Sequence, residues 1–161
     1  ALLVTHDPHE ALAICDRVAV LRGGEIQQYS TPFEMVSSPS NDFVGQFVLQ
    51  KNILPIQCST DSYSTCIGKL NLPRDISISS KSVCMFDKNA IQLKPSINND
   101  FTVISKEYRV NHYVYTVISD SIKLRSEMSL DTNLCIGEKC KVEAIHEKNF
   151  LVLPENIKSK F

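Results

Sequence analysis

The first 49 residues carry apolar and polar positions in an order that predicts a mixed α/β segment. Residues 2–5 form a short apolar run with a β-branched end, which is typical of a buried strand. Residues 7–10 predict the start of a helix, because an aspartate can cap it, a proline suits its first position and a glutamate can complete a capping box. We therefore expect a strand, then a helix that ends near Cys15.

The pattern next predicts a β-hairpin and two short helices. Residues 18–21 and 25–28 are strand-like runs on either side of Gly23-Gly24, where positive φ angles are needed. Residues 31–34 repeat the helix-start chemistry of cap, proline and capping acid, and the serines and proline that follow end that helix. Residues 41–49 place apolar side chains at helical spacing, so a last helix is expected there.

Helical spacing disappears beyond residues 50–52, and short β-type runs take its place. These runs are residues 54–58, 82–86, 90–93, 101–110, 114–119, 122–124, 141–145 and 150–153. Asp120-Ser121 is typical of a tight hairpin turn between two of them. Many short strands separated by turns favour a small barrel or sandwich.

The composition limits the class of protein and its expected partners, and it agrees with the predicted elements. The chain has 161 residues, of which 43% are hydrophobic and 22% charged, as in soluble globular proteins of one ordinary or two small domains. Residues 1–47 carry a net charge of −4 and the remainder +3, so no strongly basic face is expected. Nucleic acid is therefore not an expected partner. A trio of tyrosines at 108, 113 and 115 could form a stacking face, but cross-strand packing is favoured.

The six cysteines do not follow a metal-binding spacing. No pair is separated as C-x-x-C, and four residues separate Cys135 from Cys140. We interpret them as reduced, partly buried thiols. A metal site formed by Cys135, Cys140 and His146 is the alternative.

The residues that could carry chemistry lie near the start of the chain. His6 and Asp7 follow the predicted strand and precede the predicted helix, at the sheet edge where open α/β folds bind ligands. A helix start also favours anions, and a histidine there can bind a phosphate oxygen or order an attacking water. The alternative is a histidine that only bonds to nearby backbone.

This segment resembles the switch-histidine region of ABC transporter ATPases. Residues 11–21 are similar to the "EAL…aDRvaVl" run of that family, and residues 24–35 to its "G-x-I-x-Q…G-T-P-x-E-(I/L)" stretch. Residues 38–47 match the "P…FVA.F" ending, so the resemblance covers about residues 2–49 in order. Two residues depart from the family pattern: Ser30 stands where the family often has Gly, and Cys15 where it usually has a small residue. The resemblance implies that neither position contacts nucleotide.

The resemblance implies a role for His6 as the switch histidine that contacts the γ-phosphate of ATP, with Asp7 as its neighbour and helix cap. ATP and Mg²⁺ would be the cofactors of the intact protein. The sequence contains no G-x-x-x-x-G-K-[S/T] loop, no Leu-Ser-Gly-Gly-Gln signature and no Walker B pair, which the family places upstream of this histidine. We therefore expect upstream sequence in the intact protein, and we expect this chain alone to bind ATP negligibly and hydrolyse none. Micromolar affinity in a calorimetric titration would contradict this.

The later residues resemble the OB-like regulatory domain called TOBE that this importer subclass carries. Residues 101–119 and 134–144 are similar to two of its strand patterns, whereas Phe86-Asp87-Lys88 stands where many members have Arg-Pro-Glu. The fold class expected is thus an α/β remnant of a P-loop ABC ATPase domain at residues 1–49, a linker at 50–52 and an all-β OB-like TOBE barrel at 53–161.

The function that follows is that of a C-terminal fragment of the ATP-hydrolysing subunit of an ABC importer. The resemblance extends to iron(III), polyamine, sugar and sulfate importers, and the short tail favours iron(III) or a related anion. It implies a homodimer with a second ATPase subunit, membrane permease partners, and a cytoplasmic, peripheral place at the inner face of the membrane. The alternative is a stand-alone β-barrel module that binds a small ligand or mediates dimerisation.

Overall fold

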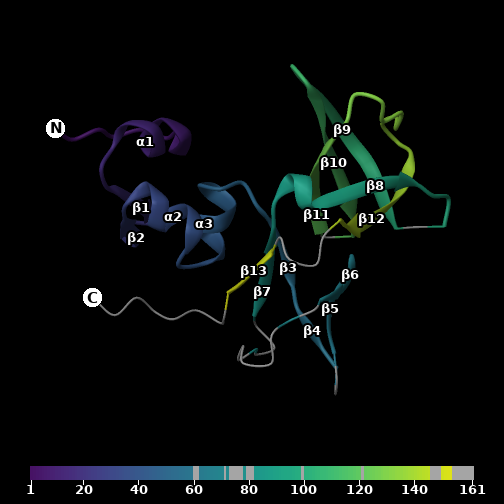
Figure 1. Cartoon of the computed structure of the whole chain (residues 1–161), viewed down its shortest axis with the longest axis horizontal. Coiled ribbons are helices and arrows are strands. Elements are labelled where there is room, and N and C mark those ends of the chain that lie inside the picture. Colours follow the sequence, from purple (N-terminus) through teal and green to yellow (C-terminus); the bar gives the residue numbers. More distant parts are fainter. Residues whose placement is uncertain are drawn as a thin grey trace.

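A computed structural model gives the fold as a mixed α/β part followed by a β-rich part (Figure 1). The structure describes residues 1–59, 62–70, 72, 78, 82–98, 100–120, 122–145 and 150–153. Among these residues, no helix is long and apolar enough to cross a membrane.

After residues 2–5, the elements of the first part follow the predicted order. They are α1 (Pro8–Ile14), β1 (Val18–Arg22), β2 (Glu25–Ser30), α2 (Pro32–Ser37) and α3 (Asp42–Phe47). Gly23 and Gly24 turn the hairpin with φ angles of 59° and 84°, as predicted. The capping box of α2 is also confirmed: the Glu34 N–H donates to Thr31 Oγ1 at 3.3 Å, and the Thr31 N–H donates to Glu34 Oε2 at 2.9 Å. These hydrogen bonds with Thr31 hold the pKa of Glu34 below its ordinary value.

Two local predictions for the first residues are wrong. Residues 2–5 are not a strand, and Leu2 and Val4 are 92% and 87% exposed. A strand exists only when a neighbour accepts its backbone hydrogen bonds, and none of the described strands pairs with this segment. Glu10 does not complete a capping box, because the Asp7 N–H donates to Thr5 Oγ1 at 3.1 Å instead.

The rest of the described chain is built of strands, as predicted. The elements are β3 (Asn52–Pro55), β4 (Gln57–Cys58), β5 (Tyr63–Thr65), β6 (Gly68–Leu70), β7 (Val83–Phe86), the 3-10 turn η1 (Lys88–Ala90), β8 (Ile91–Pro95), β9 (Phe101–Arg109), β10 (His112–Ser119), β11 (Ile122–Met128), β12 (Lys139–Ala144) and β13 (Phe150–Leu153). Several strand bounds differ from the prediction by one or two residues, and three differences are larger. The expected strand 54–58 is divided at buried Ile56, the β5–β6 hairpin was not foreseen, and β11 runs four residues further.

The strands pair antiparallel in three sheets of the β-rich part. Their orders are β11-β10-β9-β12-β8, β13-β7-β3 and β4-β5-β6. The largest sheet curls so that its two edge strands, β11 and β8, meet. Ser126 Oγ of β11 donates a hydrogen bond of 2.7 Å to the Ile91 carbonyl of β8. The described ladders do not close a barrel, and this buried side-chain bond joins the edges instead. Asp120, at φ 47°, begins the predicted β10–β11 turn, and Ser121 lies outside the described residues.

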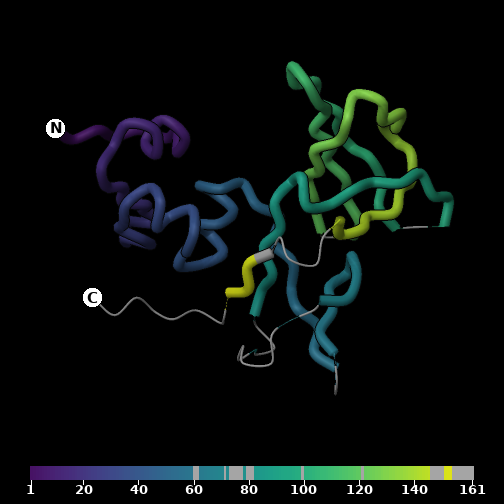
Figure 2. The backbone as a smooth tube through the Cα atoms, viewed as in Figure 1, coloured from purple at the N-terminus to yellow at the C-terminus, as the bar shows by residue number. Residues whose placement is uncertain are grey.

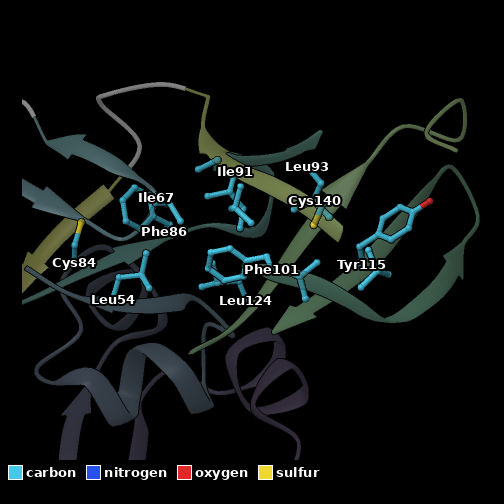
Figure 3. Close-up of a cluster of buried hydrophobic side chains, with 14 of the residues drawn as sticks. Leu54, Ile67, Cys84, Phe86, Ile91, Leu93, Phe101, Tyr115, Leu124 and Cys140 are labelled. Atoms are coloured by element: carbon cyan, nitrogen blue, oxygen red, sulfur yellow. The ribbon is translucent and has the colours of Figure 1, made fainter. Parts of the chain in front are cut away.

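The buried side chains form a large cluster in the β-rich part and a small one in the first part. Figure 3 shows the large cluster, which includes Leu54, Phe86 and Leu124, with the Tyr115 ring at one side. The small cluster consists of Val20, Met35, Val44 and Val48. Figure 2 shows the backbone running from the first part directly into β3. Helix α3 contacts both β3 and β7. That contact is tight, since a Cβ on Gly45 would lie 2.5 Å from Met85 Sδ.

Candidate functional site

A chain of local hydrogen bonds fixes the backbone around His6. Thr5 Oγ1 accepts the Asp7 N–H at 3.1 Å, and Asp7 Oδ1 accepts the His9 N–H at 2.9 Å as the N-cap of α1. Pro8 opens the helix with its preset φ and no N–H to satisfy. His6 lies exposed on the bend just before this cap. The predicted helix start is therefore confirmed beside His6, while the predicted sheet edge is not formed by the described residues.

Helix α1 lies on the surface, with no buried residue. Leu12 packs partly against the small cluster, whereas Ile14 is 70% exposed. A side-chain contact also links α1 to later residues: His9 Nε2 lies 3.3 Å from Gln50 Nε2. The helix that follows His6 is thus held by few contacts, and one of them comes from the predicted linker.

Each residue of that linker contacts the β-rich part. Gln50 Oε1 accepts a hydrogen bond of 2.7 Å from Lys88 Nζ. Lys51 Nζ donates to both carboxylate oxygens of Asp87, at 2.9 and 3.0 Å.

Asn52, which the prediction placed in the linker, is the first residue of β3 and pairs with Phe86 of β7. Its Oδ1 accepts the Arg125 N–H at 2.7 Å, and its Nδ2 donates to the Arg125 carbonyl at 2.8 Å. Asn52 is only 5% exposed, so these bonds satisfy polar groups that water does not reach freely. The segment 50–52 is therefore a connection with a defined conformation, which we call the junction.

The electrostatics of the junction centre on Lys88. Burial lowers the pKa of its ammonium, and the nearby Arg125 lowers it further, while Glu127 opposes the shift. An open hollow of about 140 Å³ lies beside it, lined by Leu49, Asp87, Lys88, Asn89 and Glu127. A partly desolvated ammonium gains from an acceptor of fixed position, and the Gln50 carbonyl oxygen is that acceptor.

The tyrosines form a packed row, as the favoured prediction stated. Tyr113 lies directly across from Tyr108 in the β9–β10 ladder, and their rings meet edge to face at 5.8 Å. Tyr115 is fully buried, and its hydroxyl donates to the Thr132 carbonyl at 3.0 Å. Lys106 Nζ lies 4.3 Å from the Tyr113 ring centre, which adds a cation–π contact.

The cysteines differ in their surroundings. Burial raises the pKa of Cys84 to about 12 and also raises the pKa of Cys140, so both remain neutral thiols. Cys135 is exposed, and His146, the third member of the alternative metal site, lies outside the described residues. Within the described ranges, no group of three His, Cys, Asp or Glu side chains could hold a metal ion.

Sequence reasoning missed Gln50 and Lys88. A sequence signal for Lys88 existed, since Asp87-Lys88 departs from the family pattern at this position. Nothing in the local sequence marks Gln50, which adopts a left-handed φ of 51° that Gly would adopt more readily.

No protein-family model matches the chain. Among curated proteins it is 31% identical over 111 residues to the Fe(3+) ions import ATP-binding protein FbpC of Streptomyces coelicolor, a match that covers 69% of this chain and 32% of that protein. It is 42% identical over 57 residues to the protein of the same name from Rhizobium etli, covering 35% and 16%. It is 35% identical over 105 residues to the Osmoprotectant import ATP-binding protein OsmV of Salmonella typhimurium, covering 62% and 26%.

Each of these matches spans a third or less of the relative's length. Further relatives are named for sulfate/thiosulfate import and for spermidine/putrescine import. The homologues of this chain are thus ATP-binding subunits of ABC importers, and the chain corresponds to their C-terminal portion. The resemblance expected from the sequence is confirmed.

Proposed function

We propose that this homologue of ABC importer ATP-binding subunits is the C-terminal portion of such a subunit and serves ATP-driven solute uptake. In this proposal residues 1–49 end the nucleotide-binding domain, residues 50–52 connect, and residues 53–161 form a regulatory domain. His6 is the switch histidine that contacts the γ-phosphate of ATP when the rest of the cradle, with its Mg²⁺, is present.

The observation that carries the proposal is the length of one match. A match of 111 residues is too long for residues 1–49, so it extends well into the β-rich part. The β-rich part therefore has a counterpart in an ABC importer subunit. A stand-alone β-barrel module would not predict that counterpart.

The described strands also support an OB-like domain of the TOBE type. The five-stranded antiparallel sheet curls so that its edge strands meet at Ser126 and Ile91. Small OB-like barrels are built from five curled strands with incomplete closure. The sheet thus has the strand number and the curvature that the proposal requires.

We further propose a homodimer, docked on membrane permease subunits at the cytoplasmic face. For the solute, the relatives' names point in several directions, since they include iron(III), sulfate, polyamines and osmoprotectants. Iron(III) is the solute we favour, because two relatives described above carry that name.

A chimaeric subunit tests the role of His6. The part of the Streptomyces coelicolor relative that precedes its counterpart of residues 1–49 is joined to this chain, and ATP hydrolysis is measured. Removing a group that positions the terminal phosphate typically lowers kcat about 100- to 1,000-fold, and we expect that loss for His6→Ala with nucleotide binding retained.

The matched control is His112→Ala, since His112 lies in β10, where its Nδ1 contacts Asn111. We expect it to hydrolyse ATP like the parent chimaera. A His6→Ala chimaera that binds ATP and hydrolyses it at the parent rate would overturn the proposed role.

A further inference from the structure

The contact of His9 with Gln50 fixes which ring nitrogen carries the proton. A lysine ammonium has donors only, so Lys88 must face the carbonyl oxygen of the Gln50 amide. The Gln50 NH₂ group must then face His9. Since an NH₂ group donates, His9 Nε2 has to accept, and it can accept only when the imidazole is neutral with its proton on Nδ1.

This chain of three side chains joins distant parts of the sequence. Lys88 belongs to η1 of the β-rich part, Gln50 to the junction, and His9 to the first turn of α1. We propose that Lys88 and Gln50 are positioning residues that fix the His9 tautomer and, through it, the placement of α1 against the β-rich part. Its meaning for nucleotide sensing rests on the proposed function, in which His6 lies three residues before His9.

The junction is built so that Gln50 keeps one position. Its left-handed φ of 51° is unfavourable for a residue with a side chain and persists only where neighbouring contacts impose it. Those contacts are next to it: the Lys51 N–H donates to the Gly45 carbonyl at 3.1 Å, and the Lys51 ammonium holds Asp87. Asn52 then binds the Arg125 backbone on both sides of its amide.

Lys88 is suited to orient the amide. Its ammonium is partly desolvated, so the Gln50 carbonyl oxygen replaces water that burial has removed. Reversing the amide would place the NH₂ group against the ammonium and leave two donors facing each other. Lys88 of the β-rich part therefore sets the direction of a hydrogen bond to His9 on α1, two hydrogen bonds away.

The tautomer is measured on the ¹⁵N-labelled chain by long-range ¹H–¹⁵N spectroscopy at alkaline pH, where imidazoles are neutral. In the parent chain we expect His9 to carry its proton on Nδ1. In Lys88→Met the amide is free to turn, so the ratio of the two tautomers should move about 2- to 10-fold towards Nε2–H, the effect of one hydrogen bond. Gln50→Glu presents acceptor oxygens only, so it should place the proton on Nε2.

Two further measurements complete the test. Lys94→Met is the matched control, because it removes a lysine paired with Glu143 in the β8–β12 ladder, and the His9 tautomer should not change. Residual dipolar couplings report the orientation of α1, which we expect to change in Gln50→Ala and to stay in Lys94→Met.

The proposal is overturned by a parent chain whose His9 proton is on Nε2, or by a Lys88→Met variant with the parent tautomer ratio. Unchanged dipolar couplings in Gln50→Ala would overturn the placement of α1. None of these measurements contains nucleotide. If the tautomer proposal fails, the proposed role of His6 is still tested by the chimaera. If the chimaera contradicts the role of His6, the tautomer result still stands.

Discussion

The two parts of the molecule are stabilised in different ways. In the described β-rich part, seventeen buried residues form one cluster that draws on most of its strands. In the first part, four buried residues form the only such cluster that the described residues show. Of the exposed large apolar side chains in the described ranges, more than half lie within residues 1–47. The first part instead relies on local devices: two glycines in a turn, and side-chain caps on each of its helices.

This difference predicts how the stability of each part responds to a single substitution. Burial of apolar surface is a collective property, so a single deletion in the large cluster affects many strands at once. Caps and turns act over a few residues, so their loss frays one element. The junction, residues 50–52, connects the first part, which depends on local caps and turns, to the β-rich part, which depends on its large buried cluster.

The largest effect is expected from a matched pair of phenylalanines, one in each part. Phe86 is fully buried in β7, and Phe33 is 80% exposed on α2. Phe86→Ala should lower the free energy of unfolding by about 3–5 kcal/mol, because it leaves a cavity in the large cluster. Phe33→Ala should change it by less than about 0.5 kcal/mol in the same urea titration. Equal effects would show that the two parts do not differ in packing as described.

A smaller loss of stability is expected from Gly45→Ala, a change that is stabilising in most helices. Replacing a helical glycine by alanine ordinarily stabilises a protein by about 1 kcal/mol. At this position the new methyl group would lie 2.5 Å from Met85 Sδ, and because Met85 is fully buried, its side chain can shift only by repacking its neighbours. We expect Gly45→Ala to destabilise the chain by about 1–3 kcal/mol in urea.

The control for Gly45→Ala is a double variant. If the clash with Met85 is the cause, combining Gly45→Ala with Met85→Ala should cost less than the sum of the two single changes. Additive costs would contradict the close approach of α3 to β7.

The smallest effect is a pH dependence confined to the β-rich part. Hydrogen bonds from Lys141 and Lys94 lower the pKa of Glu143 to about 2. A lowered carboxyl pKa means that the native state binds the proton less readily than the unfolded state, so the contribution is complete near neutral pH and is lost as pH falls towards about 2. Both lysines are more than half exposed, so the effect should be modest and weaker in high salt. Urea midpoints measured from about pH 6 down to about pH 2 should fall less steeply in Glu143→Gln than in the parent chain.

The local features were the easiest to predict, and the failures have a common physical cause. Thr31 and Glu34 form their capping box because both groups lie within one helical turn. Residues 2–5 have the apolar pattern of a buried strand, yet the described chain offers them no partner, and the pattern cannot supply one. His6 was placed correctly with respect to the helix start, which is local, and incorrectly with respect to a sheet edge, which is not.

The sequence alone therefore determined the α/β character of the first part, the β character of the second and the candidate histidine, since propensity, capping and spacing depend on residues close in the chain. Only the tertiary structure decided that Ser126 meets Ile91 across the curled sheet, and that Lys88 meets Gln50 and Gln50 meets His9. Those partners lie 35 to 41 residues apart, and their contact depends on how whole strands and helices pack. Such packing is a sum over many side chains, which no local pattern contains.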